Sequence, residues 1–381
     1  MIIQSTKVWV ASQFVPMQLH IQNERIERMY PYNTHPADVD YGDNKIVPGF
    51  IDTHIHGGYG FDTNDGDQDG LRMLQKRLPE EGVTGFLPTT VTQSEEVLTK
   101  ALLNVAAVEK EPQSGTRILG IHFEGPYLNV AFKGAQPEEH IVTPDLEQFK
   151  RYQEAANGLI KVITIAPEQD PDHTLTRYLA ETGVVASIGH SAATYQQALE
   201  AVANGAKSFT HVYNGMSRFN HRELNLVGAA FRFEDVFGEI IVDGNHSSFD
   251  AVNVFMRNKG KERVVLITDA LICKGAEIGS EWTLGGHPIV LGEDGAAYLK
   301  GTTSLSGSTL KTNVGVKNII EKVGLSWDWA IAAASTNPAR LLNMDDRKGY
   351  LRVGYDADIV VLDNNYDVVA TYVMGNLEYQ K

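Results

Sequence analysis

The sequence has little of several features that mark particular classes of protein. It contains one cysteine, Cys273, so it cannot form an intramolecular disulfide, and we expect a reducing compartment, the cytoplasm. No apolar run is long enough to cross a bilayer. Polar residues interrupt the first segment, MIIQSTKVWVASQF, so we expect no signal peptide. Internal repeats and low-complexity segments are also missing from the sequence.

Basic residues are too few to suggest a nucleic-acid partner. The chain has 33 Lys and Arg against 48 Asp and Glu, which gives a formal net charge of −15, and it contains no basic run. Proteins that bind nucleic acid normally carry a basic stripe, so we expect no such partner. An anionic substrate would need a local positive pocket within this acidic protein.

The length and composition suit a large globular fold. The chain has 381 residues, of which 43% are hydrophobic and 21% are charged, so nothing suggests disorder. Because a single α/β barrel takes about 250 residues, the length predicts one barrel and a smaller second unit.

Both ends of the chain are rich in strand-like segments. Moderate alternation occurs in KVWVASQF and QLHIQNERIERMY near the start, and DADIVVLD and DVVATYVMGNLEY have the same character near the end. Asn-Asn at 364–365 and Gly-Asn at 375–376 are turn signals. We therefore expect residues 1–49 and 346–381 to form one small β-sandwich domain.

The middle of the chain, residues 50–345, is expected to form an α/β barrel. Eight short apolar runs end in polar residues: IVPGFIDTHIH, GVTGFLPTT, ILGIHFEGP, KVITIAPE, VVASIGHS, SFTHVYN, GEIIVDGNH and RVVLITDA. Helix-like stretches separate most of them, as in ATYQQALEAVANG, where Tyr195, Leu199 and Val202 have helical spacing. Strands that are buried on both faces and alternate with helices indicate a parallel sheet, and eight such units indicate a closed (β/α)8 barrel.

Polar residues gather at the carboxyl ends of the expected strands, where barrels of this kind carry their chemistry. They are His54, His56, Glu124, His190, His211, Asn214, His246 and Asp269. A single histidine at a strand end is more often a hydrogen-bonded core or loop residue than a ligand. Several of them at one barrel mouth would cost free energy unless they were paired or bound to an ion.

Metal chemistry accounts for the spacing of these residues. His54 and His56 stand at i and i+2 on a strand, so both imidazoles point to one face and can grip a first-row metal. Glu124, His190 and His211 end separate strands and would make a three-ligand site with an open fourth position, which is typical of catalytic metals.

Further residues suit proton transfer and anion binding. Asp269 ends the eighth strand and could take a proton from water and pass it to a leaving amine, although a helix N-cap or a further metal ligand are alternatives. His246 could hold a carbonyl or a phosphate. Arg222 suits bidentate phosphate binding, but a loop arginine is equally often only solvated. The segment GTTSLSGSTL offers backbone N–H groups that could hold an anion.

The motifs together resemble a known family. PGFIDTHIHGG, HFEGPYLN, KGAQPE, IGHS, THVYNGM, IVDGNHS, LITDA and TSLSGS occur in the order found in N-acetylglucosamine-6-phosphate deacetylases of the amidohydrolase superfamily. The resemblance spans nearly the whole chain. It implies hydrolysis of the acetamido group of N-acetyl-D-glucosamine 6-phosphate to D-glucosamine 6-phosphate and acetate, in amino-sugar catabolism and recycling. It also implies a homodimer and one or two divalent ions per subunit, with zinc or iron favoured over cobalt or manganese.

The same resemblance implies residue roles. Glu124, His190 and His211 are the principal metal ligands, His54 and His56 serve a second ion that only some members carry, and Asp269 is the general base and acid. The sugar-phosphate site is expected to comprise Ala135, Gln136, Asn214, Gly215, Arg222, His246, Leu305, Ser306 and Gly307.

Three departures from the family pattern qualify these roles. Some members have histidine at the position of Gln136, and the family often has alanine at that of Gly215. Glu-Pro-Gly is usual where Glu223-Leu224-Asn225 follows Arg222 here, so the loop can differ in shape. The family also implies that this loop can cross to the neighbouring subunit, with Arg222 as the residue that acts there.

Three other functions compete with this interpretation. Cyclic amidases of the superfamily use a carboxylated lysine to bridge two metals, but no lysine stands at an expected strand end. A deacetylase for the galactosamine epimer differs by one hydroxyl and stays open. A non-catalytic metal or sugar-phosphate binding protein would take up metal without releasing acetate, and Asp269 argues against it because binding alone needs no proton shuttle.

Overall fold

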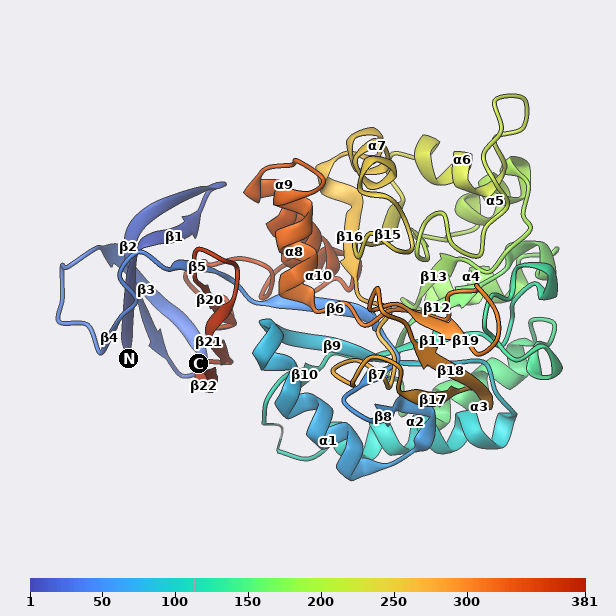
Figure 1. The fold of residues 1–381 in the computed structure, drawn as a ribbon, viewed down its shortest axis with the longest axis horizontal. Coiled ribbons are helices and arrows are strands. Elements are labelled where there is room, and N and C mark those ends of the chain that lie inside the picture. The colour runs from blue at the N-terminus through green and yellow to red at the C-terminus, as the bar shows by residue number, and fades with distance from the viewer. Residues whose placement is uncertain (113) are drawn as a thin grey trace.

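The structure is a computed structural model that describes residues 1–112 and 114–381. Two units stand side by side in Figure 1: a sheet built from both chain ends, in blue and red, and a barrel wrapped by helices. The predicted fold class, a (β/α)8 barrel with a small β domain from both ends, is confirmed. Among the described residues, no helix combines the length and the apolar character that crossing a membrane requires.

Each of the eight predicted apolar runs supplies one barrel strand. The strands are β6 (Phe50–Ile55), β9 (Val83–Thr90), β11 (Ile121–Glu124), β12 (Ile160–Ile165), β13 (Val185–Ile188), β14 (Ser208–Phe209), β15 (Phe237–Ile241) and β16 (Val264–Ile267). They pair in parallel in this order, and the short β10 (Arg117–Ile118) also pairs with β9. A parallel bridge between Ile55 and Ala270 joins the last strand to the first. The strands are almost wholly buried because the interior and the outer helices cover both faces.

Helices follow most of the strands. They are α1 (Gln68–Arg77), α2 (Glu95–Glu109), α3 (Leu146–Ala155), α4 (Thr174–Thr182), α5 (Tyr195–Ala203), α6 (Asn225–Arg232), α7 (Phe249–Lys259), α8 (Thr312–Glu321), α9 (Trp327–Ile331) and α10 (Asn337–Leu341). Thr194 and Gln197 form a capping box at the start of α5. The helix is where its spacing predicted it: Tyr195 and Val202 pack half-buried against the core beside the buried Ala198 and Ala201, whereas Leu199 is 40% exposed.

Short helical turns complete the connections. They are 3-10 turns η1 (Thr63–Asp65), η2 (Leu78–Glu81), η3 (Val130–Phe132), η4 (Glu138–His140), η5 (Pro167–Gln169) and η6 (Lys261–Arg263), and the π-helical turn η7 (Ala332–Thr336). The turns η3 and η4 lie in the loop that follows β11, beside the mouth of the barrel.

The two chain ends share one eight-stranded sheet. Its strands are β1 (Ile2–Val10), β2 (Gln13–Gln22), β3 (Arg25–Pro31), β4 (Val39–Asp40), β5 (Lys45–Pro48), β20 (Ile359–Leu362), β21 (Val368–Val373) and β22 (Asn376–Gln380), and β5 pairs antiparallel with β20. Ile3 and Leu19 meet Ile359 in one apolar cluster, so the sheet folds over its own core. Val47 and Val360 point the other way and join the barrel core. The domain limits at 49/50 and 345/346 remain a prediction.

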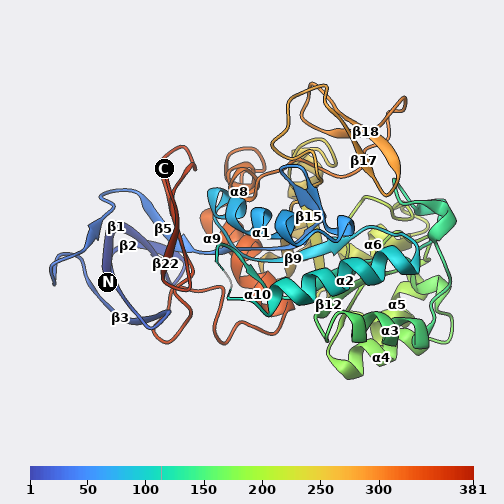
Figure 2. The same cartoon turned by 90° about the horizontal axis from the view of Figure 1, so that it is seen from below.

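A small antiparallel sheet between β16 and α8 was not predicted. It consists of β17 (Glu281–Leu284), β18 (His287–Leu291) and β19 (Ala297–Leu299), and a two-stranded ribbon, β7 (Gly57–Gly58) and β8 (Phe61–Asp62), follows β6. Gly285 and Gly286 turn the chain between β17 and β18 with φ of 55° and 90°, which suits the two-residue loop of a hairpin. Figure 2 shows β17 and β18 projecting beyond the barrel.

Candidate functional site

A cavity of about 160 Å³ opens at the carboxyl ends of the barrel strands, where the sequence placed the chemistry. Nearly all of the predicted site residues line it: His56, Glu124, Ala135, Gln136, His190, His211, Asn214, Gly215, His246, Asp269, Leu305, Ser306 and Gly307. His54 lies completely buried against this group, and Arg222 is the predicted residue that stands apart. Val91, Gly134 and Leu284 also line the cavity and were not predicted.

The carboxylate of Glu124, at the end of β11, lies at the centre of four imidazoles. Its Oε1 is 3.3 Å from Nε2 of His190 and 3.2 Å from Nε2 of His211. The same oxygen is 3.4 Å from Nε2 of His54, and Oε2 is 3.3 Å from Nε2 of His56. Glu124 therefore connects two pairs of histidines. His54 and His56 lie at the end of β6, and His190 and His211 follow β13 and β14.

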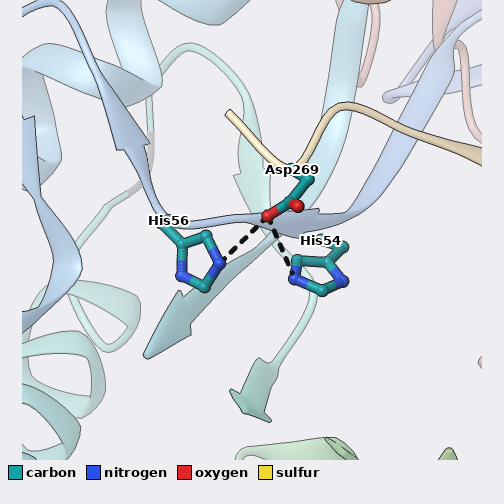
Figure 3. Close-up of side chains that lie close together, drawn as sticks. All are labelled: His54, His56 and Asp269. Carbon is teal, nitrogen blue, oxygen red and sulfur yellow. Dashed lines mark ion pairs between the residues drawn. The ribbon is translucent and has the colours of Figure 1, made fainter. Parts of the chain in front are cut away.

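Asp269, just beyond β16, faces the first pair of histidines. Its Oδ1 is 3.1 Å from Nε2 of His56 and 3.5 Å from Nε2 of His54, as Figure 3 shows. A backbone hydrogen bond of 2.8 Å from Asp269 N to His54 O holds the two chain segments together. The carboxylate thus lies beside His54 and His56, across Glu124 from His190 and His211.

All four histidines turn Nε2 toward this centre because Nδ1 is engaged elsewhere. The Nδ1 partners are Phe132 O for His190 at 2.9 Å, Asn214 O for His211 at 3.0 Å, Thr89 O for His56 at 3.3 Å and Glu239 Oε2 for His54 at 3.1 Å. Carbonyl oxygens can only accept, so the three imidazoles that face them must donate from Nδ1. That leaves Nε2 as the atom offered to the centre of the site.

Charge at the centre favours a cation. Burial disfavours the imidazolium of His56, but Asp269 and Glu124 outweigh it and raise its pKa to about 9. For His54 the same carboxylates overcome burial and raise the pKa well above its usual range. Burial raises the pKa of Asp269 less than the neighbouring histidines lower it, so the carboxylate is ionised. The carboxylates stabilise positive charge here, whether protons or a divalent ion carry it.

Three of these residues have left-handed backbone conformations. His190, His211 and Asp269 have φ of 47°, 29° and 52°. Such values are uncommon outside glycine and cost of order 1–3 kcal/mol each, so the surrounding structure must impose them. Each of the three residues follows the end of its strand, and the turn there aims its side chain across the mouth of the barrel. The fold bears strain at the residues that carry the chemistry.

The donor set fits metal ions. Glu124, His190 and His211 bring one ligand atom each within 4.8 Å of one another, and His54, His56 and Asp269 form a second such group. In the first group, Nε2 of His190 and Nε2 of His211 are only 3.1 Å apart. Two neutral imidazoles that both direct a lone pair to one point would repel, and a shared cation removes that repulsion.

Gln136, predicted to bind substrate, has both ends of its amide engaged by protein groups. Its Nε2 donates to Glu124 Oε2 at 2.7 Å, and its Oε1 accepts from Thr92 N at 2.7 Å. Thr92 follows β9, so Gln136 ties Glu124 to the neighbouring strand. The side chain fixes the orientation of the central carboxylate.

Other polar groups that line the cavity remain available to a ligand. Ser306 Oγ is buried without a hydrogen-bond partner in the described part of the chain. His246 Nδ1 lies 2.7 Å from Asp243 Oδ2, so its Nε2 is the nitrogen left to donate toward a ligand. Burial opposes the charged imidazole of His246, but Asp243 raises its pKa above the usual value. Asp243 thus favours the charged form of His246, and the free hydroxyl of Ser306 lies in the same cavity.

Arg222 lies outside this cavity. It is exposed in the loop 217–224 before α6, where its backbone N–H bonds to Asn220 Oδ1 at 2.9 Å. Phe219, in the same loop, is 52% exposed. The structure of one subunit therefore does not bring Arg222 to the other predicted residues.

Two carboxylates that contact histidines of the candidate site were missed by the sequence reasoning. Glu239 lies within β15 and bonds to His54, and Asp243 lies just beyond that strand and bonds to His246. Both stand in GEIIVDGNH, where an acidic residue within an otherwise apolar strand was the available signal. Their histidine partners could not be identified from the sequence.

Comparisons with known proteins agree with this geometry. A family model described as the amidohydrolase family matches residues 46–377. This chain belongs to the amidohydrolase family. It is 40% identical to N-acetylglucosamine-6-phosphate deacetylase of Bacillus subtilis over 88% of this chain and 85% of the relative, which confirms the resemblance seen in the motifs.

Two further relatives bear on the substrate of this amidohydrolase. One is N-acetylgalactosamine-6-phosphate deacetylase of Escherichia coli O157:H7, 34% identical over 94% of each chain. The other is a solved structure of N-acetyl-D-glucosamine-6-phosphate deacetylase from Mycobacterium smegmatis, an aspartate-to-alanine mutant in complex with N-acetyl-D-glucosamine-6-phosphate. It is 30% identical, with a TM-score of 0.94 and coverage of 100% of this chain and 99% of that chain. Amidohydrolases generally depend on divalent metals, which agrees with the candidate ligand groups of this chain.

Proposed function

We propose that this amidohydrolase cleaves the acetamido group of N-acetyl-D-glucosamine 6-phosphate to give D-glucosamine 6-phosphate and acetate, in amino-sugar catabolism and recycling. The observation that carries the proposal is the carboxylate of Asp269 beside a centre of one glutamate and four histidines, at the mouth of the barrel. The B. subtilis relative and the M. smegmatis structure support this substrate.

The metal ligands are assigned by group. Glu124, His190 and His211 would hold the tighter ion, while His54 and His56 support a second ion next to Asp269. Histidine and carboxylate donors suit zinc or iron, and cobalt or manganese can replace them. When bound between these residues, a divalent ion would supply Lewis-acid chemistry, which lowers the pKa of water and polarises an amide carbonyl.

The protein's own residues account for the proton transfers. Asp269 takes a proton as a water oxygen bonds to the acetamide carbon, and it returns that proton to the nitrogen as the C–N bond breaks. No covalent intermediate with the protein is needed. His56 Nε2 lies 3.1 Å from Asp269 Oδ1 and holds this carboxylate where it lines the cavity.

Substrate recognition is assigned to the wall of the cavity that Leu305, Ser306 and Gly307 help to form. His246 and Ser306 would donate hydrogen bonds to the sugar phosphate, while Asn214, Gly215 and Ala135 line the same cavity. The turn at Leu305 and Gly307 completes that wall. Charge-assisted hydrogen bonds from His246 would offset the acidic field of the whole protein.

Acetate release from a panel of substrates, with metal analysis of the purified chain, tests the proposal. The panel holds N-acetylglucosamine 6-phosphate, its galactosamine epimer and unphosphorylated N-acetylglucosamine. Fastest release from the first supports the proposal. A preference for the epimer would assign the activity of the E. coli relative. Bound metal without acetate from any substrate would indicate a binding protein instead.

Removing the carboxylate beside His246 should weaken substrate binding in a pH-dependent way. Asp243 raises the pKa of His246, so in Asp243→Asn that pKa falls and the imidazole loses its charge at a lower pH. A hydrogen bond to a charged group contributes about 1.5–3 kcal/mol. In the pH range where His246 is charged in the wild type but neutral in the variant, kcat/KM should therefore fall about tenfold or more. Profiles of kcat/KM against pH measure this. Parallel profiles would remove Asp243 from recognition.

We further propose a cytoplasmic homodimer in which Arg222 serves the partner's site. The exposed Arg222 and Phe219 lie on a loop outside their own cavity, which supports a role at a subunit contact. Sedimentation velocity tests the dimer, and cell fractionation tests the compartment. A monomer at working concentrations would contradict the proposal.

Arg222→Ala should lower kcat/KM for the phosphorylated sugar about 10–100-fold and change it little for the unphosphorylated sugar, because only the former offers an anion. Mixing this variant with Asp269→Asn subunits makes the test sharper. In a mixed dimer, the Arg222→Ala subunit keeps its own Asp269. Its site can then receive Arg222 from the Asp269→Asn subunit. Recovered activity supports action across the interface, whereas no recovery places Arg222 in its own subunit's site.

A further inference from the structure

Glu239 is a completely buried carboxylate beneath the candidate metal centre. It lies on β15, and its Oε2 accepts a hydrogen bond from His54 Nδ1 at 3.1 Å and a long one from the backbone N–H of His211 at 3.4 Å. Its Oε1 has no hydrogen-bond partner among the described residues. A buried carboxylate is costly unless other groups compensate it, so this position needs an explanation.

Direct metal binding does not account for Glu239. His54, His122 and Glu239 are close enough to form a third ligand group. However, His122 Nδ1 lies 3.0 Å from Thr53 O and its Nε2 lies 2.8 Å from Thr164 Oγ1, so both ring nitrogens are engaged. The group lacks a free His122 nitrogen, and the remaining partner of Glu239 is the imidazole of His54.

His54 differs from the other three histidines of the centre in this contact. The others face backbone carbonyls through Nδ1, and His54 faces a carboxylate. A carboxylate is the stronger acceptor, and it makes the distal nitrogen of an imidazole more basic. The Nε2 of His54 is itself buried without a hydrogen-bond partner among the described residues, 3.5 Å from Asp269 Oδ1.

We propose that Glu239 is a positioning residue that keeps the proton of His54 on Nδ1 and so presents Nε2 to the ion beside His56 and Asp269. This inference rests on the proposed metal dependence. Glu239 does not touch substrate or the ligands' Nε2 atoms, and its effect passes through His54. His190 and His211 keep their own carbonyl contacts at Nδ1, and Glu239 reaches His211 only through a long backbone contact of 3.4 Å, so the effect is expected mainly at the ion beside His54.

Zinc titration of the metal-free chain and of Glu239→Gln tests the inference. Glutamine keeps the shape but removes the charge, and the loss of a supporting contact of this kind typically weakens metal binding about 10–100-fold. We expect that increase in the Kd of the weaker zinc ion and an unchanged Kd for the tighter one. Unchanged binding of both ions, or equal weakening of both, would overturn the inference.

Glu81→Gln is the matched control. Glu81 is also completely buried, and it pairs with Lys274 at 2.8 Å away from the cavity. This variant should lower thermal stability and leave both zinc affinities as in the wild type. Selective loss of the weaker ion in Glu81→Gln as well would indicate a general effect of buried charge and would overturn the inference.

A measurement on the unchanged chain covers the case in which Glu239→Gln does not fold. In zinc-loaded protein with ¹⁵N-labelled histidine, the signals missing from His54→Gln identify His54, and its proton should reside on Nδ1. A proton on Nε2 would overturn the inference, as would uptake of a single ion by the wild type. The proposed function is tested by acetate release, whereas this inference is tested by zinc binding and by the position of the proton on His54. The inference can therefore fail while the proposed function holds.

Discussion

Replacing Asp269 with asparagine is expected to lower kcat about 10²–10⁴-fold while the chain keeps its fold. Asparagine has nearly the same shape and can still offer a carbonyl oxygen near His56, but it cannot accept and return a proton at neutral pH. Substrate binding should change much less than turnover. Steady-state acetate release gives kcat, and thermal unfolding checks the fold.

Asp170→Asn is the matched control for this prediction. Asp170 is also buried, and it caps α4 by accepting from Thr176 N at 2.9 Å, a contact that an asparagine oxygen can keep. Its turnover should stay close to that of the wild type. Near-normal kcat in Asp269→Asn would remove Asp269 from the mechanism, and Glu124 would then have to be considered as the base.

His190→Ala should abolish activity together with the tighter ion. The variant loses an imidazole that lies 3.3 Å from Glu124 and 3.1 Å from His211, so two ligands remain in that group. Because loss of a supporting contact alone typically costs about 10–100-fold, loss of a ligand should reduce kcat/KM by more than about 100-fold. Elemental analysis of the purified variant and acetate release measure the two effects.

His20→Ala provides the comparison, because His20 lies on β2 in the sheet of the chain ends, far along the chain from the cavity residues. Its metal content and turnover should match those of the wild type. If His190→Ala retained full metal and full turnover, the assignment of Glu124, His190 and His211 would be wrong.

The barrel could be predicted because each of its strands is a short apolar run, buried on both faces, that ends in polar residues. The sheet of β17, β18 and β19 could not. Its strands are mostly exposed or half-buried, with Leu284 as the buried exception in β17, so their hydrophobic pattern is weak. The turn at Gly285 and Gly286 was the clearer signal of a hairpin. It was not sufficient, because glycine pairs also occur in loops.

The site could be predicted where residue type alone suggests chemistry. His54, His56, Glu124, His190, His211 and Asp269 all stand at or just after strand ends, and the closed barrel brings them to one place. The contacts that orient them come largely from carbonyl oxygens, such as Phe132 O and Asn214 O. Every residue has a carbonyl, so no sequence pattern reveals which one an imidazole will meet.

The long-range pairing of β5 with β20 has a consequence for biosynthesis. Ile359 lies opposite Pro48 in that ladder, and every barrel strand is encoded between them. On the ribosome, β5 therefore emerges with its partner β1 already made, but its second partner, β20, follows only after synthesis of the entire barrel. Until β20 arrives, the nascent chain displays an unpaired strand edge together with the apolar side chains that will later be covered. Completion of the small sheet is thus a late event in synthesis, because β20, β21 and β22 follow every strand of the barrel.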